Sequence, residues 1–471
     1  NSTLSALKPF AAQTGVIPLK IMKNFISLSE IREINMKKLF LISFIIYLIL
    51  LLLTCKKESP IEPPTPTTGS IYGIVIDVKT QLPVVDAVVV AIKSQISDTT
   101  DSLGIFGLKE VPIGTETLQV CAEDYEAENK VVQVKPDSQW IAISLNWAQG
   151  IWKHLGLENK FIQRLRLFIP YLYACTPSEG LWRINIQNNT SNWEYLGFAE
   201  PGLGHYRGVG VTDILVNPDN TEEMLLAFNP DNASAHGIYK STDGGNSWFV
   251  SDSGLGYDTN YYSHPGIFCN PSYDLFAAGG HLVHTSDFGD IWEKISGIAG
   301  GINDFRYHNL YDNYLWMGSQ HLFGGPILYF SSDSGKTWDY DLLETLVTGD
   351  NAIFSIAFNP NDPDIVYASM FKRIIKTTDG GASWFIIMSY SGPGYIFSIV
   401  EDDSQSDRLF AATGFTALET RDGGKNWFDL ESPNGSGIVT MLYDSEYKAL
   451  YIGTGSGPNP PNGVFVYKKT N

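Results

Sequence analysis

Short apolar runs separated by turn-forming residues fill the chain from residue 150 to residue 471. In one stretch, runs at residues 353–358, 365–369, 373–377 and 384–387 follow one another, with an Asn-Pro turn after the first. Runs of this length that are rich in β-branched and aromatic residues and bounded by Gly, Pro, Asn and Asp are typical of antiparallel strands. The pattern therefore predicts units of four short strands.

One eight-residue pattern, Ser/Thr-x-Asp-x-Gly-x-x-Trp, recurs five times in this region. The copies begin at residues 241, 285, 331, 377 and 420, so consecutive starts lie 44, 46, 46 and 43 residues apart. A fixed period of this length indicates a repeat architecture in which each repeat is one supersecondary unit.

The residue types of the pattern suit a tight turn. An Asp side chain accepts hydrogen bonds from the backbone of its own turn, Gly adopts the backbone angles the turn requires, and Trp buries a large ring. We therefore expect the repeated aspartates to be structural and not catalytic; they are Asp243, Asp287, Asp333, Asp379 and Asp422.

The pattern resembles the Asp-box, or BNR repeat, of sialidases, sortilin-type receptors, xyloglucan hydrolases and photosystem II assembly-factor propellers. The resemblance covers residues 150–471 and implies a β-propeller. It implies little about function, because those relatives include enzymes, receptors and assembly factors.

Tryptophans set the number of blades. Trp152 and Trp193 stand where two more post-turn strands would begin, which with the five repeats makes seven marks. The runs at 450–454 and 463–468 supply only the second and third strands of a last blade. We expect residues 151–157 to add its outer strand, giving a seven-bladed propeller that closes its ring without a long free sheet edge.

The front of the chain has the composition of an export signal. Residues 36–55 combine a basic start, an apolar run and a final Cys55, and they resemble a bacterial lipoprotein signal in which Cys55 takes the lipid. An uncleaved signal-anchor helix is the alternative. We interpret residues 1–35 as a disordered upstream extension and 56–69 as a Pro-rich linker. An exported, membrane-anchored lipoprotein, periplasmic or at the cell surface, is expected.

Residues 70–146 alternate apolar positions with Gly, Pro and Asp turns, which predicts a small Ig-like or prealbumin-like β-sandwich. Its phrases resemble the carboxypeptidase regulatory-like domain, and the resemblance implies a spacer. The whole chain is therefore expected to be all-β after its signal segment.

Composition limits the partners. The net charge of −19 argues against nucleic acid and against direct adhesion to anionic lipid. The four cysteines suggest no disulfide framework, and the eight histidines lack metal-ligand spacing. We expect no metal, no cofactor and a monomer, attached to a membrane through its N-terminal lipid or anchor.

Aligned inner strands place five polar residues in one column, Asp213, Asp304, Ser355, Ser398 and Thr440. This predicts a polar ring near the channel. The groups either bind water in a hydrated channel, or Asp213 and Asp304 act as a general acid and base for glycoside cleavage.

Loops that lead into the inner strands are rich in aromatic and polar residues, which suit sugar faces or peptide segments. The candidate ligand-binding residues are Tyr206, Arg207, Tyr257, Tyr261, Tyr262, His264, Arg306 and Tyr395.

We predict a cell-surface lipoprotein whose propeller binds an extracellular glycan or protein. A glycoside hydrolase of xyloglucanase-like type is the first alternative, and an assembly or secretion scaffold is the second. A sialidase is disfavoured, because residues 164–170 resemble the family's Arg-Ile-Pro phrase only superficially.

Overall fold

The computed structural model of the protein describes residues 43, 66–148, 150–188, 192–199, 210–229, 237–254, 266–269, 275–278, 282–295, 298, 301–308, 311–320, 325–343, 350, 352–431, 433, 437–455 and 462–469. Sequence-based expectations for residues 1–35, for most of 36–55 and for Cys55 lie outside this part of the chain.

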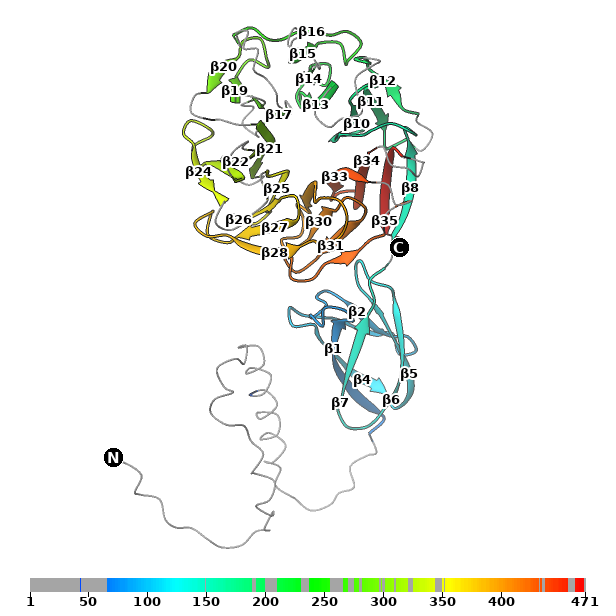
Figure 1. Cartoon of the computed structure of the whole chain (residues 1–471). Coiled ribbons are helices and arrows are strands. Elements are labelled where there is room, and N and C mark those ends of the chain that lie inside the picture. Colours follow the sequence, from blue (N-terminus) through cyan, green and yellow to red (C-terminus); the bar gives the residue numbers. More distant parts are fainter. Residues whose placement is uncertain are drawn as a thin grey trace, which may run out of the picture. The chain divides into compact units, whose positions relative to one another are not determined.

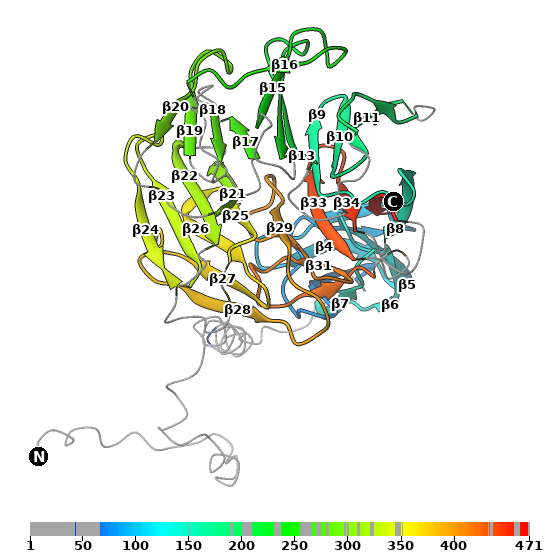
Figure 2. The ribbon, with the colours of Figure 1, turned by 45° about the horizontal axis from the view of Figure 1, so that its top comes forward.

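Seven four-stranded sheets, here called blades 1 to 7, stand around a common centre in the described part of the chain (Figures 1 and 2). The strands of blades 1 to 6 run from inner to outer in sequence order. Blade 1 consists of β9 (Arg164–Phe168), β10 (Tyr171–Thr176), β11 (Gly180–Asn185) and β12 (Glu194–Tyr195), and blade 2 of β13 (Gly210–Val216), β14 (Met224–Asn229), β15 (Ile238–Ser241) and β16 (Phe249–Val250). Blade 3 consists of β17 (Gly266–Cys269), β18 (Leu275–Ala278), β19 (Leu282–Thr285) and β20 (Glu293–Ile295), and blade 4 of β21 (Gly301–His308), β22 (Tyr311–Gln320), β23 (Ile327–Ser331) and β24 (Asp339–Leu342). Blade 5 consists of β25 (Ser355–Asn359), β26 (Asp362–Ser369), β27 (Arg373–Thr377) and β28 (Phe385–Ser389), and blade 6 of β29 (Ser398–Glu401), β30 (Leu409–Ala412), β31 (Ala417–Thr420) and β32 (Phe428–Asp429).

Blade 7 is completed by a strand from the front of the ring. Its first three strands are β33 (Ile438–Asp444), β34 (Ala449–Thr454) and β35 (Val464–Lys469), and β8 (Gly150–Gly156) pairs antiparallel with β35. The inner strands of successive blades contact one another, and β33 contacts β9. The ring is therefore closed, and the fold is a seven-bladed β-propeller with the closure that the tryptophans predict.

Apolar side chains fill the space between neighbouring blades. One cluster joins Leu165 and Leu172 of blade 1 to Tyr451 and Val464 of blade 7, all nearly inaccessible to solvent. Because each blade buries its faces against two neighbours, the hydrophobic effect holds the ring together without a central core.

The repeated turns share one hydrogen-bond arrangement. In the first, Ser247 donates its backbone N–H to Asp243 Oδ1 over 2.8 Å, and Gly244 and Gly245 have φ of 69° and 90°. In the third, hydrogen bonds from Thr337 lower the pKa of Asp333 to about 2. Each carboxylate is thus occupied by its own turn, in the same way in all five copies.

The front module packs two sheets over one core. The strands are β1 (Thr68–Asp77), β2 (Val88–Ala91), β3 (Ile96–Thr99), β4 (Ile105–Pro112), β5 (Gly114–Cys121), β6 (Glu128–Val134) and β7 (Gln139–Leu145). Their sheets have the orders β4-β1-β7 and β3-β2-β5-β6, and Ile71, Phe106 and Leu118 lie in the core between them. This is a small β-sandwich.

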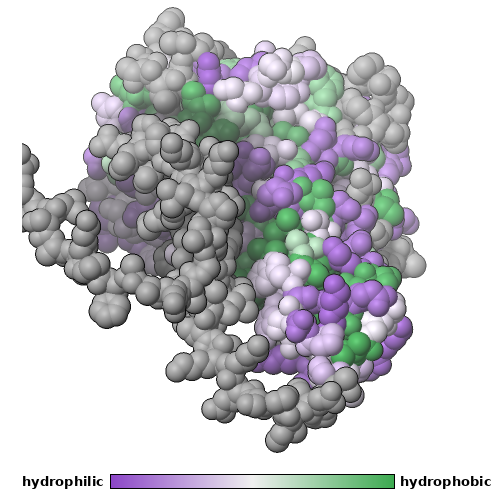
Figure 3. Space-filling model, turned by 90° about the horizontal axis from the view of Figure 1, so that it is seen from below, coloured by the Kyte–Doolittle hydropathy of each residue, from purple (hydrophilic) through white to green (hydrophobic). Residues whose placement is uncertain are grey.

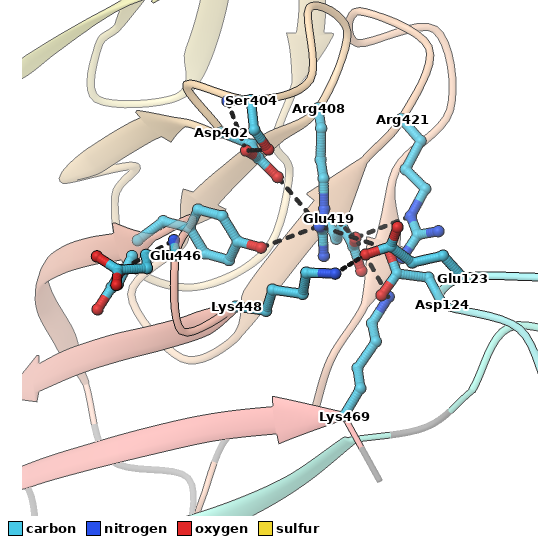
Figure 4. A network of polar contacts seen from close by, with 12 residues as sticks. Glu123, Asp124, Asp402, Ser404, Arg408, Glu419, Arg421, Glu446, Lys448 and Lys469 are labelled. Atoms are coloured by element: carbon cyan, nitrogen blue, oxygen red, sulfur yellow. Dashed lines mark hydrogen bonds and ion pairs between the residues drawn. The ribbon is translucent and has the colours of Figure 1, made fainter. Parts of the chain in front are cut away.

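A charged cluster connects the sandwich to blades 6 and 7 (Figure 4). Asp124, on the β5–β6 connection, forms ion pairs with Arg421 (2.9 Å), Lys469 (3.2 Å) and Arg408 (3.4 Å). Oε1 of the fully buried Glu419 lies 2.8 Å from Arg408 and 2.9 Å from Arg421. We call Asp124, Arg408, Glu419, Arg421 and Lys469 the junction network.

An aromatic contact accompanies the junction network. Trp147 lies 4.0 Å from Phe428, measured between ring centroids, and the Arg421 guanidinium lies over Trp147 at 4.3 Å. On the face of the molecule seen in Figure 3, hydrophilic and hydrophobic residues are interspersed over the described part, without one dominant apolar patch.

Candidate functional site

Charged residues from the inner strands surround a cavity of about 130 Å³ in the propeller. Arg164 and Arg166 stand two positions apart on β9, and alternate residues of a strand point to the same side. Both line the cavity, as do Asp304 and Arg306 of β21 and Glu401 of β29. We call Arg164, Arg166, Asp213, Asp304 and Arg306 the channel network.

Asp213 is locked by an arginine of the neighbouring blade. Arg166 donates two hydrogen bonds of 2.8 Å, one to each carboxylate oxygen of Asp213, which is completely buried. The backbone N–H of Ile214 donates a third. Burial acts to raise the pKa of Asp213, but Arg166 and Arg164 outweigh it and hold the pKa below its usual value. Asp213 is therefore ionised at neutral pH and forms a structural pair with Arg166.

Asp304 is held from two blades and shared by two arginines. Its Oδ2 accepts hydrogen bonds from Arg306 Nε (3.2 Å) and from the backbone N–H of Ile356 in blade 5 (2.8 Å). Its Oδ1 lies 4.0 Å from Arg164 Nη1. Because both arginines approach one carboxylate, their guanidinium groups lie close together beside the cavity.

The Arg164 side chain has N–H donors that its two ion pairs do not use. Its ion pairs with Asp213 (3.7 Å) and Asp304 (4.0 Å) are both longer than a hydrogen bond. A guanidinium has five N–H donors. Among the described residues, no acceptor lies within hydrogen-bond distance of the Arg164 side chain, so its donors are available to a cavity ligand or water.

Glu401 is the cavity's unmatched acceptor. Its Oε2 is buried and has no hydrogen-bond partner among the described residues. Burial raises the pKa of Glu401, nearby Asp304 adds to this, and Arg306 opposes it. A carboxyl group with an unused oxygen on a cavity is placed to bind a ligand hydroxyl or amide.

Aromatic rings pack between the cavity lining and the surface of the propeller. Phe354 and Phe397, which directly precede β25 and β29, line the cavity. Phe354 lies 4.8 Å from Phe371, and Phe371 lies 4.7 Å from Tyr395, both between ring centroids. Tyr395 is 43% exposed. The rings therefore form a continuous cluster from the cavity lining to an exposed tyrosine.

Phe415 belongs to the same end of the blades. A Cβ on Gly394 would lie 2.7 Å from the Gly414 backbone, so the loops that carry Tyr395 and Phe415 touch at two glycines. Gly394 has a φ of 85°, which side chains other than glycine rarely adopt. Phe415 is also 43% exposed. We call Phe371, Tyr395 and Phe415 the aromatic rim.

The structure brings many of the sequence-predicted residues together. Asp304, Arg306, Ser355, Ser398 and Thr440 all line the cavity, Asp213 lies beside it through Arg166, and Tyr395 stands at its outer end. The remaining candidates fall outside the described residues; they are Tyr206, Arg207, Tyr257, Tyr261, Tyr262 and His264.

Sequence reasoning missed Arg164, Arg166 and Glu401. The spacing of the two arginines on an inner strand was the available signal, because it places both on one side of β9. Glu401 is the last residue of β29 and gave no signal of its own, because a glutamate at the end of a strand is usually solvated.

Within the described part of the chain, no group of three or more His, Cys, Asp or Glu side chains is arranged to hold a metal ion. The same residues include no helix with the length and apolar character that a membrane span requires.

Comparison with known proteins bears on the class of fold. No protein-family model matches the chain, and no curated protein matches it either. The WD40 repeats of RRP9 align with a TM-score of 0.50 at 9% identity, over 69% of this chain and 99% of that one. WD40 repeats form propellers, so this similarity indicates a propeller and, at that identity, nothing of function.

Two further solved structures are similar to the chain. YCF48 bound to a D1 peptide has a TM-score of 0.49 at 14% identity, over 69% of this chain and 96% of that one. The GH74 xyloglucanase from Xanthomonas campestris has a TM-score of 0.41 at 14% identity, over 67% of this chain and 63% of that one.

Proposed function

We propose that this protein is an exported, membrane-tethered propeller that binds an extracellular glycan or protein at the aromatic rim. The observation that carries the proposal is the continuity of the rim with the cavity. Tyr395 contacts Phe371 and Phe397, and Phe397 lines the cavity with Arg164 and Glu401. Concave sites with apolar walls and a few convergent polar groups are the usual form of ligand sites.

Binding is favoured over catalysis by the state of the two aspartates. A general acid or base must exchange a proton, yet Arg166 holds Asp213 ionised and doubly hydrogen-bonded. Asp304 is held by Arg306 and by a backbone N–H. Both carboxylates therefore position arginines in this proposal.

The test of binding uses the full chain on arrays of glycans and peptides. Tyr395→Ala removes an exposed ring of the rim and should weaken binding of any ligand found. Phe385→Ala, on outer strand β28, removes a ring that is equally exposed, at 43%, and should leave binding unchanged. Equal binding by the wild type and the Tyr395 variant would exclude the rim as the site.

A glycoside hydrolase is the second candidate, and Glu401 is the observation that favours it. A carboxyl group whose pKa is raised by burial has the property of a general acid. Mass spectrometry of products released from plant, microbial and sialylated glycans tests this candidate. Loss of product in Glu401→Gln with retained folding would support an enzyme, whereas no product across the panel would leave binding.

The tether and the family assignments are part of the proposal. Residues 36–55 resemble a lipoprotein signal, the repeated turns resemble Asp-boxes, and residues 70–146 resemble a carboxypeptidase regulatory-like spacer. The ion pairs of Asp124 support a spacer role, because they link the sandwich to the propeller. Mass spectrometry of the N-terminal peptide should find a lipid on Cys55, and Cys55→Ser should release the protein from membranes.

A further inference from the structure

We infer that the cavity takes an uncharged sugar residue of a glycan, with its hydroxyl groups on Arg164, Arg306 and Glu401 and its chain over the aromatic rim. This inference rests on the binding function proposed above and narrows its ligand to one chemical class.

The first argument is the hydrogen-bonding inventory of the cavity. Arg164 supplies N–H donors without an acceptor among the described residues, and Arg306 uses Nε on Asp304. Glu401 Oε2 is a buried oxygen without a partner. A hydroxyl group both donates and accepts, so neighbouring hydroxyls on one sugar ring can satisfy the arginines and the glutamate together.

The second argument is the charge balance. Three arginines, Arg164, Arg166 and Arg306, face three carboxyl groups, those of Asp213, Asp304 and Glu401. Asp403 adds a further acidic group to the lining. An anionic ligand would place its charge beside these carboxylates in a chain of net charge −19, and a cation would meet the arginines. A neutral ligand avoids both costs.

The third argument is the position of the aromatic rings beside the cavity. The rings of Tyr395 and Phe415 are exposed, and Phe354 and Phe397 line the cavity itself. Aromatic faces suit the apolar faces of sugar rings while the polar groups set orientation. A peptide would present one N–H and one C=O per residue along an extended chain, which matches a compact cluster of two donors and one acceptor less well.

The experiment measures binding of the full chain by calorimetry to soluble probes. The probes are neutral oligosaccharides of glucose, galactose, mannose and xylose, an oligogalacturonate, the fully methyl-esterified form of that oligogalacturonate, and an acidic peptide. The ester and the acid share one sugar backbone and differ at the carboxyl group, where the ester carries a methyl group in place of the charge, so this pair compares a neutral with an anionic form of the same chain.

Three variants locate the site. Glu401→Gln and Tyr395→Ala should each weaken the bound neutral probe about tenfold or more, because a hydrogen bond to a charged group and a stacked ring are each lost. Phe385→Ala, outside the cavity, should change affinity less than about twofold. Tyr395 is exposed, so its variant reports on binding even if Glu401→Gln folds poorly.

The outcomes separate this inference from the function beneath it. Binding of a neutral probe that both variants weaken supports it. The inference of a neutral sugar is overturned if the oligogalacturonate binds more tightly than its ester, or if the acidic peptide binds more tightly than the neutral oligosaccharides. If Tyr395→Ala weakens that binding, the aromatic rim remains a binding site. Binding of no probe, or binding that Tyr395→Ala leaves unchanged, overturns the inference and the proposed site together.

Discussion

The channel network and the junction network both consist of arginines paired with carboxylates, but they differ in whether a ligand can contact them. In both, two arginines share one carboxylate, Arg164 and Arg306 at Asp304 and Arg408 and Arg421 at Glu419. In both, one carboxylate oxygen has no hydrogen-bond partner among the described residues, Oε2 of Glu401 beside the channel network and Oε2 of Glu419 in the junction. Glu401 lines the cavity described above.

Exposure separates the two networks further. The side chains of Arg408 and Arg421 in the junction are 5% and 14% exposed, whereas those of Arg164 and Arg306 are 16% and 28% exposed. Unused polar capacity that a ligand can reach supports recognition, and the same capacity sealed between domains supports only their attachment. The difference predicts that substitutions in the channel network and in the junction network change different properties of the protein.

The largest effect is expected for Asp213→Ala. Arg166 would be left as a buried cation without its bidentate partner, which costs about 3–5 kcal/mol of unfolding free energy. Urea denaturation measures this. Glu123→Ala is the matched control, because both side chains of the Glu123–Lys448 pair are exposed and its loss should cost less than about 1 kcal/mol. Equal costs would contradict the buried pair.

Asp124→Ala is expected to cost about 2 kcal/mol, since three cations lose one shared partner but keep Glu419. The sandwich should loosen from the propeller, and limited proteolysis should cut faster between residues 146 and 150. Glu123→Ala breaks only an exposed pair with Lys448 and should change neither stability nor cleavage. Unchanged cleavage in both variants would contradict a junction held by Asp124.

The channel network should also make folding acid-sensitive. The pKa of Asp213 is lowered in the folded state, so its contribution is complete above the unfolded value, about 4, and is lost as pH falls further. Melting temperatures measured from pH 7 down to pH 2 should fall less steeply in Asp213→Asn than in the wild type. Parallel curves would show that Asp213 does not titrate in this way.

The smallest effect is expected for Glu401→Gln, and its sign is opposite. The pKa of Glu401 is raised in the folded state, so stability is lost as pH rises above about 4. The amide should therefore be more stable than the wild type at pH 7 and show no such gain at pH 3. Glu128→Gln, at an exposed position, should show no gain at either pH. A loss at pH 7 would mean that the carboxylate stabilises the fold.

Much of the fold could be predicted because its determinants are local. The tryptophan period indicated seven blades, and the absence of a box before Trp152 indicated the closing strand that the structure shows as β8. Strand bounds shifted by a few residues. The run at 365–369, for example, belongs to a strand that begins three residues earlier, at Asp362.

The site was less predictable because its chemistry depends on pairs far apart in sequence. The column of polar inner-strand residues was found from alignment of blades, and Asp304, Ser355, Ser398 and Thr440 do line one cavity. The pairing of Arg166 with Asp213 joins residues 47 positions apart, and only the folded ring brings them together. Sequence alone therefore could not show that the aspartates are already occupied.

The pairing of β8 with β35 sets an order of assembly. Strand β8 emerges early during synthesis but finds its partner only after residues 464–469 have been made. Until then the propeller has two open edges, and non-local pairing of this kind slows folding. A chain cut short before residue 464 would leave β8 and β34 as open edges able to pair with other molecules.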